Sequence, residues 1–229
     1  MLFRSISERP IAAHRRSRRG HWEGDTVMGS DLRHCVLTLV ERKTGFVIIM
    51  KLKARSMEQA RRALLRAIAR HPGMFKTITF DNGTEFHDYK AVERVHPLKC
   101  YFATPYHSWE RGSNENMNGL IRQYLPKGSC MRRITQADCD RIACRLNSRP
   151  RKRYGFKTPN QLFFNPRGVA LDVRTQAEAC LDLAGLAPGL ARELAALYHL
   201  RHCSCATPGI RSRWVTLQHR STCSSATRY

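Results

Sequence analysis

Apolar and β-branched residues are concentrated in three early segments, and this pattern predicts three strands. They span residues 22–28 (WEGDTVM), 34–40 (HCVLTLV) and 46–52 (FVIIMKL). The turn ERKTG, which ends at Gly45, joins the second segment to the third. The three segments are therefore expected to form an antiparallel meander.

Helical spacing of apolar residues begins at residue 56, where Ser56 is the expected N-cap of a helix that runs to Arg70. Further strands are expected at residues 77–80 and 98–102, and further helices at residues 85–93, 135–147 and 158–164. Thr135 is the expected cap of the second of these helices, with Asp138 three residues on. The order β-β-β-α-β-α-β-α-α predicts an α/β domain.

The chain divides into three parts. Residues 1–20 are rich in arginine and are expected to form a basic, solvated and mobile arm. Residues 21–165 contain the predicted elements and form the expected core. Beyond about Pro166 the character changes, so residues 166–229 are expected to form a separate tail that is partly helical or disordered.

The stretch Pro105–Gly128 predicts a helix with two chemically different sides. Its core-facing stripe is Met117, Leu120, Ile121 and Tyr124, and its other side carries Glu115, Asn118, Gly119 and Arg122. Ser113 is the expected N-cap, which would place Glu115 in the first turn, where the helix dipole favours a carboxylate. We interpret this as a functional face. An ordinary solvated helix surface is the alternative.

Two aspartates stand at informative places in the predicted strands. Asp25 interrupts the first strand, where aspartate is disfavoured, and Glu23 would point the same way because strands have a period of two. Asp81 ends the fourth strand and precedes Asn82-Gly83, a position at which α/β sheets often carry ligand chemistry. The alternatives are a cap residue for Asp25 and an ordinary Asp-Asn-Gly turn for Asp81.

Asp25, Asp81 and Glu115 could meet at one end of a sheet beside its neighbouring helix. Three crowded carboxylates repel one another unless a divalent cation neutralises them. Mg²⁺ suits such a site because it takes few carboxylates and keeps water and phosphate oxygens as its other ligands.

The net charge of the chain indicates what kind of molecule it binds. The chain has 229 residues with 40 Lys and Arg against 18 Asp and Glu, a formal net charge of +22. That imbalance favours a long polyanion, DNA or RNA, although charge alone leaves a merely cationic protein possible. The sequence contains no run of 18 apolar residues, so no membrane span is expected. The first ten residues, MLFRSISERP, lack the apolar segment of a secretion signal.

Four segments together resemble one family: GHWEGD (20–25), TFDNGTEF (79–86), the stretch Pro105–Gly128, and RPRKRYGFKTP (149–159). They look like the insertion-sequence transposases of the IS-thirty family, in the DDE transposase and retroviral integrase superfamily. The spacing is also similar, with 33 residues between Asp81 and Glu115. The resemblance covers residues 4–165. It implies a ribonuclease-H-like fold, with a mixed five-stranded sheet flanked by helices and followed by a poorly defined C-terminal tail.

The resemblance also implies a function. Asp25, Asp81 and Glu115 would be the metal-binding catalytic triad, with Mg²⁺ as cofactor and Mn²⁺ as a possible substitute. The reaction would be nicking at transposon ends followed by attack of the freed 3′-hydroxyl on target DNA. The protein is expected to act as a homo-oligomer on DNA, in the cytoplasm and associated with the nucleoid. Residues expected to contact DNA are Arg111, Asn114, Asn118, Arg122, Lys127, Arg149, Arg151, Lys152 and Arg153.

The chain departs from the family in two ways. It begins almost at the catalytic domain, without the helix-turn-helix segments that family members carry, and its tail resembles nothing in the family. The sequence therefore suggests a truncated transposase. Two other functions stay open, a catalytically inactive DNA-binding remnant and a basic RNA-binding protein. The complete set of three acids argues against the RNA-binding protein.

Overall fold

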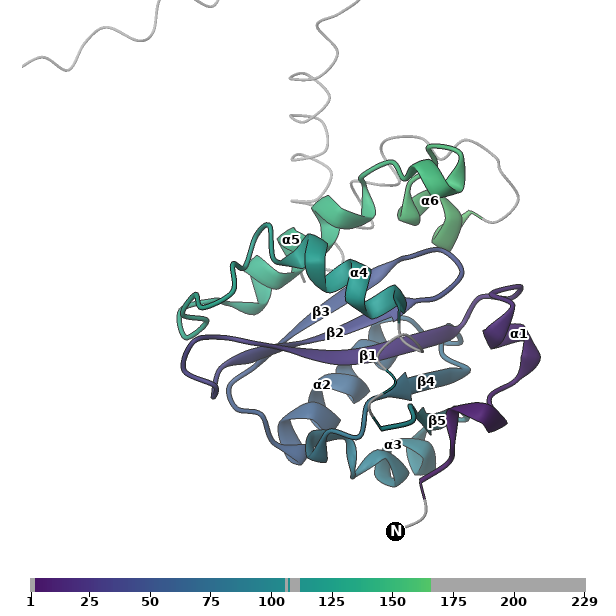
Figure 1. The fold of residues 1–229 in the computed structure, drawn as a ribbon, viewed down its shortest axis with the longest axis horizontal. Coiled ribbons are helices and arrows are strands. Elements are labelled where there is room, and N and C mark those ends of the chain that lie inside the picture. Colours follow the sequence, from purple (N-terminus) through teal and green to yellow (C-terminus); the bar gives the residue numbers. More distant parts are fainter. Residues whose placement is uncertain (1–2, 106, 108–111, 166–229) are drawn as a thin grey trace, which may run out of the picture.

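Five strands form one mixed sheet in the order β3-β2-β1-β4-β5, as the computed structural model of the chain shows (Figure 1). The structure describes residues 3–105, 107 and 112–165. β1, β2 and β3 are antiparallel neighbours, and β4 and β5 run parallel to β1. The strands are β1 (His21–Met28), β2 (Cys35–Glu41), β3 (Val47–Leu52), β4 (Thr77–Phe80) and β5 (Lys99–Phe102). Each predicted strand is confirmed to within one residue at either end.

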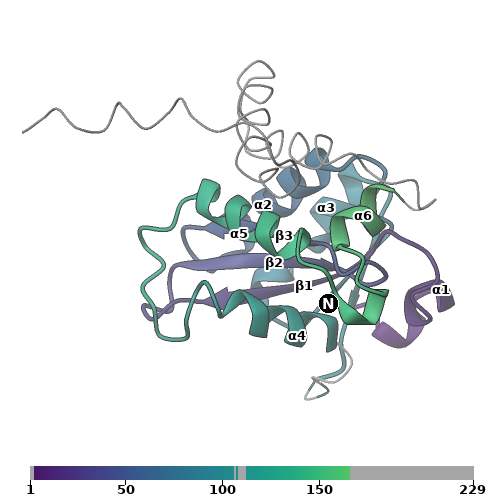
Figure 2. The same cartoon turned by 90° about the horizontal axis from the view of Figure 1, so that it is seen from above.

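Helices cover both faces of this sheet, and each face has its own apolar core. In Figure 2, α2 and α3 lie on one side of the sheet and α4 on the other. The helices are α1 (Ile11–His14), α2 (Met57–Arg70), α3 (Tyr89–Val95), α4 (Gly112–Ile121), α5 (Gln136–Asn147) and α6 (Pro159–Phe164). Short 3₁₀ turns occupy Ile6–Glu8, Thr84–Phe86 and Lys152–Tyr154. The predicted α/β fold class is therefore confirmed.

Two of the three predicted helix N-caps are confirmed. Ser56 accepts a hydrogen bond from the backbone N–H of Gln59, and Thr135 forms a reciprocal capping box with Asp138, both as predicted. The prediction for Ser113 is wrong, because α4 already begins at Gly112 and Ser113 lies buried in its first turn. Glu115 is in that first turn, as expected.

The N-terminal segment is packed against the sheet, so the prediction of a mobile arm is wrong for residues 3–20. The Phe3 ring lies 4.6 Å from the Phe102 ring, measured between centroids. Arg4 donates to Oε1 of Glu93 at 2.6 Å. Arg9 is only 5% exposed and donates to Oγ1 of Thr79 at 3.2 Å. These contacts join the segment to β4, β5 and α3.

The predicted tail at residues 166–229 lies outside the described residues. None of the helices among the described residues could span a lipid bilayer.

Candidate active site

The parallel pairing of β1 with β4 brings the two predicted aspartates to the same end of the sheet. Glu23 is the register partner of Thr79, and Asp25 and Asp81 each lie two residues further along their segments. Neighbouring strands are about 4.8 Å apart, so the two backbones that carry the acids are adjacent. The convergence expected of Asp25 and Asp81 thus has a direct structural basis.

The carboxylate of Asp25 is held at both oxygens. Oδ1 accepts from the backbone N–H of Thr26 at 2.9 Å, and Oδ2 accepts from the side-chain amide of Asn118 at 2.8 Å. Asn118 belongs to α4, so this bond joins the helix directly to the acid on β1. The side chain of Asp25 is half-buried.

Glu115 lies one turn before Asn118 on α4, and its side chain is exposed. Residues three apart on a helix have Cβ atoms roughly 5–6 Å apart, so Glu115 lies beside the residue that binds Asp25. The start of α4 is fixed to the same strand, because the backbone N–H of Asn114 donates to Oε2 of Glu23 at 3.0 Å. Glu23 is fully buried and forms an ion pair with Arg42. The helix that carries Glu115 is therefore anchored to β1 on either side of it.

Asp81 follows β4 in a tight turn. Its Oδ1 accepts from the backbone N–H of Gly83 at 3.1 Å. A Cβ atom at Gly83 would lie 2.6 Å from Oε2 of Glu85 and 3.0 Å from Oδ1 of Asp81, so a larger residue would force one of the two carboxylates to shift. This close approach places a further acid, Glu85, next to Asp81.

Glu85 was not identified as a site residue from the sequence, although the motif TFDNGTEF contains it. Glu85 is 2% exposed. Its Oε1 accepts from Nε of Arg55 and from Oγ1 of Thr26, each at 2.8 Å. Burial alone would raise the pKa of Glu85, but the hydrogen bonds from Arg55 and Thr26 hold that pKa below its ordinary value. Glu85 is therefore ionised at neutral pH and connects the strand of Asp25 to the turn of Asp81.

The donor chemistry of Asp25, Asp81 and Glu115 fits a hard divalent cation, since all three offer carboxylate oxygens. Among the described residues, however, no group of three or more His, Cys, Asp or Glu side chains is placed to hold one metal ion. The backbone thus brings the acids to one end of the sheet, but their side chains do not form a closed cluster. A shared metal ion remains a proposal.

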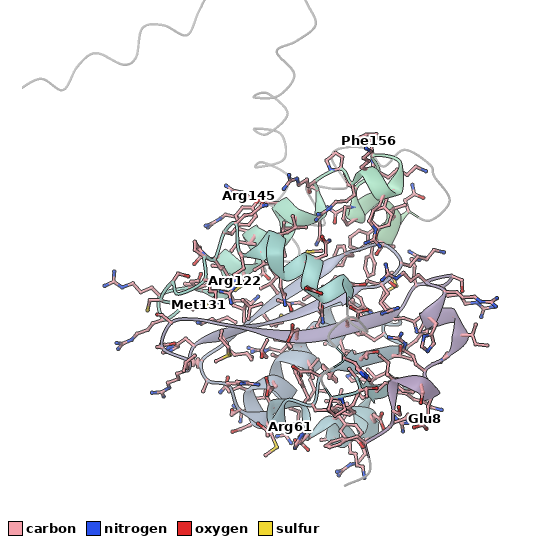
Figure 3. The ribbon with its side chains drawn as sticks, viewed as in Figure 1. Glu8, Arg61, Arg122, Met131, Arg145 and Phe156 are labelled. Atoms are coloured by element: carbon pink, nitrogen blue, oxygen red, sulfur yellow. The ribbon has the colours of Figure 1, made fainter. Side chains whose placement is uncertain are left out.

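Three residues expected to contact DNA make contacts within the protein or are buried. Asn114 is 1% exposed, so the prediction that its side chain touches DNA does not hold in this structure. Arg122, on the α4 side of the sheet in Figure 3, donates to the carbonyl of Met28 at 3.2 Å. Arg151 donates to the carbonyl of Leu146 at 3.1 Å, and burial lowers its pKa. Arg111 lies outside the described residues.

Of the other predicted DNA contacts, Asn118 is half-buried and donates to Asp25. The remaining four lie on the surface: Lys127, Arg149, Lys152 and Arg153 are exposed. The guanidinium of Arg153 lies 4.5 Å from the ring centroid of Tyr154. Arg153 also lines the same small cavity as Ser113 and Asn116 of α4. The basic loop that follows α5 therefore reaches the start of the helix that carries Glu115.

Comparisons with known proteins agree with this architecture. Residues 15–108 match the family model described as integrase core domain, a range that includes Asp25 and Asp81 and ends before Glu115. The transposase for insertion sequence element IS4351 of Bacteroides fragilis is 41% identical over 158 residues, which cover 69% of this chain and 48% of that protein. Transposase InsI for insertion sequence element IS30C of Escherichia coli (strain K12) is 41% identical over 167 residues, covering 72% of this chain and 43% of that protein.

The chain spans about half the length of these relatives. Among solved structures, the catalytic core domain of BIV integrase superposes with a TM-score of 0.51 at 20% identity, over 65% of this chain and 96% of that one. That similarity concerns the fold, and it confirms the expected ribonuclease-H-like arrangement of a five-stranded sheet between helices. In sequence, residues 15–108 match the integrase core domain, and the chain is similar to transposases of insertion sequences.

Proposed function

We propose that this chain is the catalytic core of a DDE-type transposase that cuts DNA at transposon ends and joins it to target DNA. One observation carries the proposal. The β1–β4 register puts Asp25 and Asp81 on adjacent backbones, and the Asn118–Asp25 hydrogen bond brings the helix of Glu115 to the same place. Integrase-type chemistry would use three acids that lie close in space, and this arrangement supports Asp25, Asp81 and Glu115 in that role.

Asp25, Asp81 and Glu115 would hold Mg²⁺, or Mn²⁺ as a substitute. When bound, the metal would supply activation of the attacking water or 3′-hydroxyl and stabilisation of the leaving oxygen. The chain's own residues prepare the site. Asn118 orients Asp25, and the N–H of Gly83 orients Asp81. The side chain of Glu115, in the first turn of α4, is exposed and so accessible to a phosphodiester.

The partners in this proposal are transposon-end and target DNA, bound by a homo-oligomer in the cytoplasm at the nucleoid. Four exposed cations would neutralise DNA phosphates: Lys127, Arg149, Lys152 and Arg153. Their contribution is expected to weaken with salt rather than to select a sequence.

A second candidate, a DNA-binding remnant without catalysis, has one observation in its favour: the three acids do not form a closed cluster among the described residues. It predicts DNA binding of the same strength with no cleavage at any metal concentration.

The deciding experiment is nicking of a supercoiled plasmid with Mg²⁺ or Mn²⁺. Asp81→Asn keeps an oxygen that accepts from the N–H of Gly83 but removes the negative charge. Loss of a residue that only supports a metal ligand costs roughly 10–100-fold, so loss of the ligand charge itself should reduce nicking by more than that. Asp88→Asn is the matched control, because Asp88 forms a surface ion pair with Arg61 and should leave nicking unchanged. Absence of nicking by the unaltered chain in both metals, with DNA binding retained, would favour the remnant.

A further inference from the structure

A basic groove lies at the edge strand β3, away from the residues assigned to DNA above. It has a volume of about 970 Å³ and lies between α2 and the segment that leads into α5. Six cations line it: Arg33, Lys51, Lys53, Arg62, Arg66 and Arg132. No carboxylate is among the residues that line it. Its lining therefore carries a large excess of positive charge.

Most of this charge is not neutralised by the protein. Arg62 pairs with Glu58 at the surface, and His34, also in the lining, pairs with Asp31. Lys51 donates to the carbonyl of Met131, which carries no charge. The side chains of the other four cations make no hydrogen bond or ion pair with the described residues; these are Arg33, Lys53, Arg66 and Arg132. Like charges held together in this way favour an anionic ligand.

The groove opens at the same end of the sheet as the acids. Cys35, at the start of β2, is paired with both Met28 at the end of β1 and Leu52 at the end of β3. β1 and β3 are separated by two strand spacings, about 10 Å. Arg55 follows Lys53 by two residues and donates to Glu85, the buried acid beside Asp81. A duplex at the acids would extend past the groove within one helical turn of about 34 Å.

We propose that this groove binds the phosphate backbone of the duplex DNA whose phosphodiester lies at Asp25 and Asp81. The choice of DNA as the polyanion rests on the proposed function. The groove itself contributes contacts to phosphates rather than to base edges, since flexible exposed cations neutralise charge without reading sequence. It would hold the DNA on the far side of the site from the basic loop that contains Arg153.

The test compares two fourfold variants of the full chain with equal loss of charge. The groove variant changes Arg33, Lys53, Arg66 and Arg132 to glutamine. The control variant changes Lys76, Lys90, Arg94 and Lys99, which are exposed near α3 and β5, to glutamine. All eight side chains are exposed, and circular dichroism with thermal melting checks that both variants fold.

Binding to a labelled duplex of about 30 base pairs, roughly three helical turns, is measured over a salt series. Each phosphate contact contributes about −0.9 to the slope of log Kobs against log salt. Loss of four contacts should therefore reduce the magnitude of the slope by about 3.6 in the groove variant, and by less than about 1 in the control. Equal losses in both variants would overturn the proposal, as would a larger loss for an RNA duplex of the same sequence than for DNA.

Plasmid nicking by the groove variant separates this inference from the proposed function. Nicking that persists at saturating DNA, together with a reduced slope, supports both. A reduced slope with no nicking by the unaltered chain supports the groove and contradicts catalysis. Nicking with an unchanged slope supports catalysis and contradicts the groove.

Discussion

At the residue scale, Asn118 shows how a surface-facing amide serves a neighbouring acid. Its Nδ2 donates to Asp25 at 2.8 Å, and its Oδ1 lies 3.4 Å from the hydroxyl of Thr38, the partner of Asp25 across β1 and β2. Thr38 is fully buried, so this side of Asn118 is held by the core. The residue is expected to position Asp25 rather than to read DNA.

Asn118→Ala should therefore weaken metal binding more than DNA binding. Removing an outer-shell partner of a metal ligand costs about 10–100-fold in metal affinity. We expect the Mg²⁺ concentration for half-maximal nicking to rise by that factor, with DNA affinity in the absence of metal nearly unchanged. Asn116→Ala, an exposed position on the same helix, is the control. Weaker DNA binding with an unchanged metal requirement would instead support the original assignment of Asn118 to DNA.

At the scale of elements, α5 covers the open edge of the sheet with two side-chain amides. Gln136 accepts from the N–H of Lys51 at 2.9 Å and donates to the carbonyl of Ile49 at 3.0 Å. Asn147 accepts from the N–H of Val47 at 2.9 Å and donates to its carbonyl at 2.8 Å. The two amides are 11 residues apart, about three helical turns, so they lie on one face of α5. They occupy backbone groups through which an edge strand could otherwise pair with another chain.

Asn147→Ala should destabilise the fold by about 2–4 kcal/mol, because it leaves a buried backbone N–H and a carbonyl unpaired. Urea unfolding measures this change. Arg141→Ala, on the exposed side of the same helix, should change stability by at most about 0.5 kcal/mol. If the two variants unfold at the same urea concentration, the amides do not stabilise the edge.

At the scale of the whole molecule, two buried histidines link stability to pH. Burial, together with nearby Lys76, lowers the pKa of His21 to about 4, and burial with nearby Arg70 lowers the pKa of His71 to about 4. His21 bonds Thr77 at 2.8 Å between β1 and β4, and His71 ends α2 against aromatic rings. Both are neutral in the folded protein at pH 7.

Stability should consequently be highest above about pH 6.5, the ordinary histidine pKa, and fall as the pH drops towards 4. In that interval the unfolded chain binds protons that the folded protein does not, so acid favours unfolding. Thermal melting at several pH values measures the slope. His71→Gln cannot titrate and should melt with a shallower dependence on pH between 6.5 and 4. A slope equal to that of the unaltered chain would exclude His71 as its source.

Local patterns predicted most of the elements because strands and helix caps depend on residues close in sequence. The strands, the Ser56 cap and the Thr135 capping box were all confirmed. Predictions that depended on packing were less successful. The arginine-rich start of the chain suggested a solvated arm, yet Arg4 and Arg9 bind groups about 70 to 90 residues away in the sequence. Composition gives the number of charged side chains but does not show which of them form hydrogen bonds or ion pairs within the fold.

The sequence by itself determined the order of strands and helices, the strongly positive charge, and the places of Asp25, Asp81 and Glu115 on their elements. Periodicity, composition and motif spacing carry that information locally. Only the tertiary structure decided which side chains surround the acids, that Glu85 lies beside Asp81, and that six scattered cations line one groove at β3. The physical reason is that strand register and helix packing create these contacts between residues far apart in the chain.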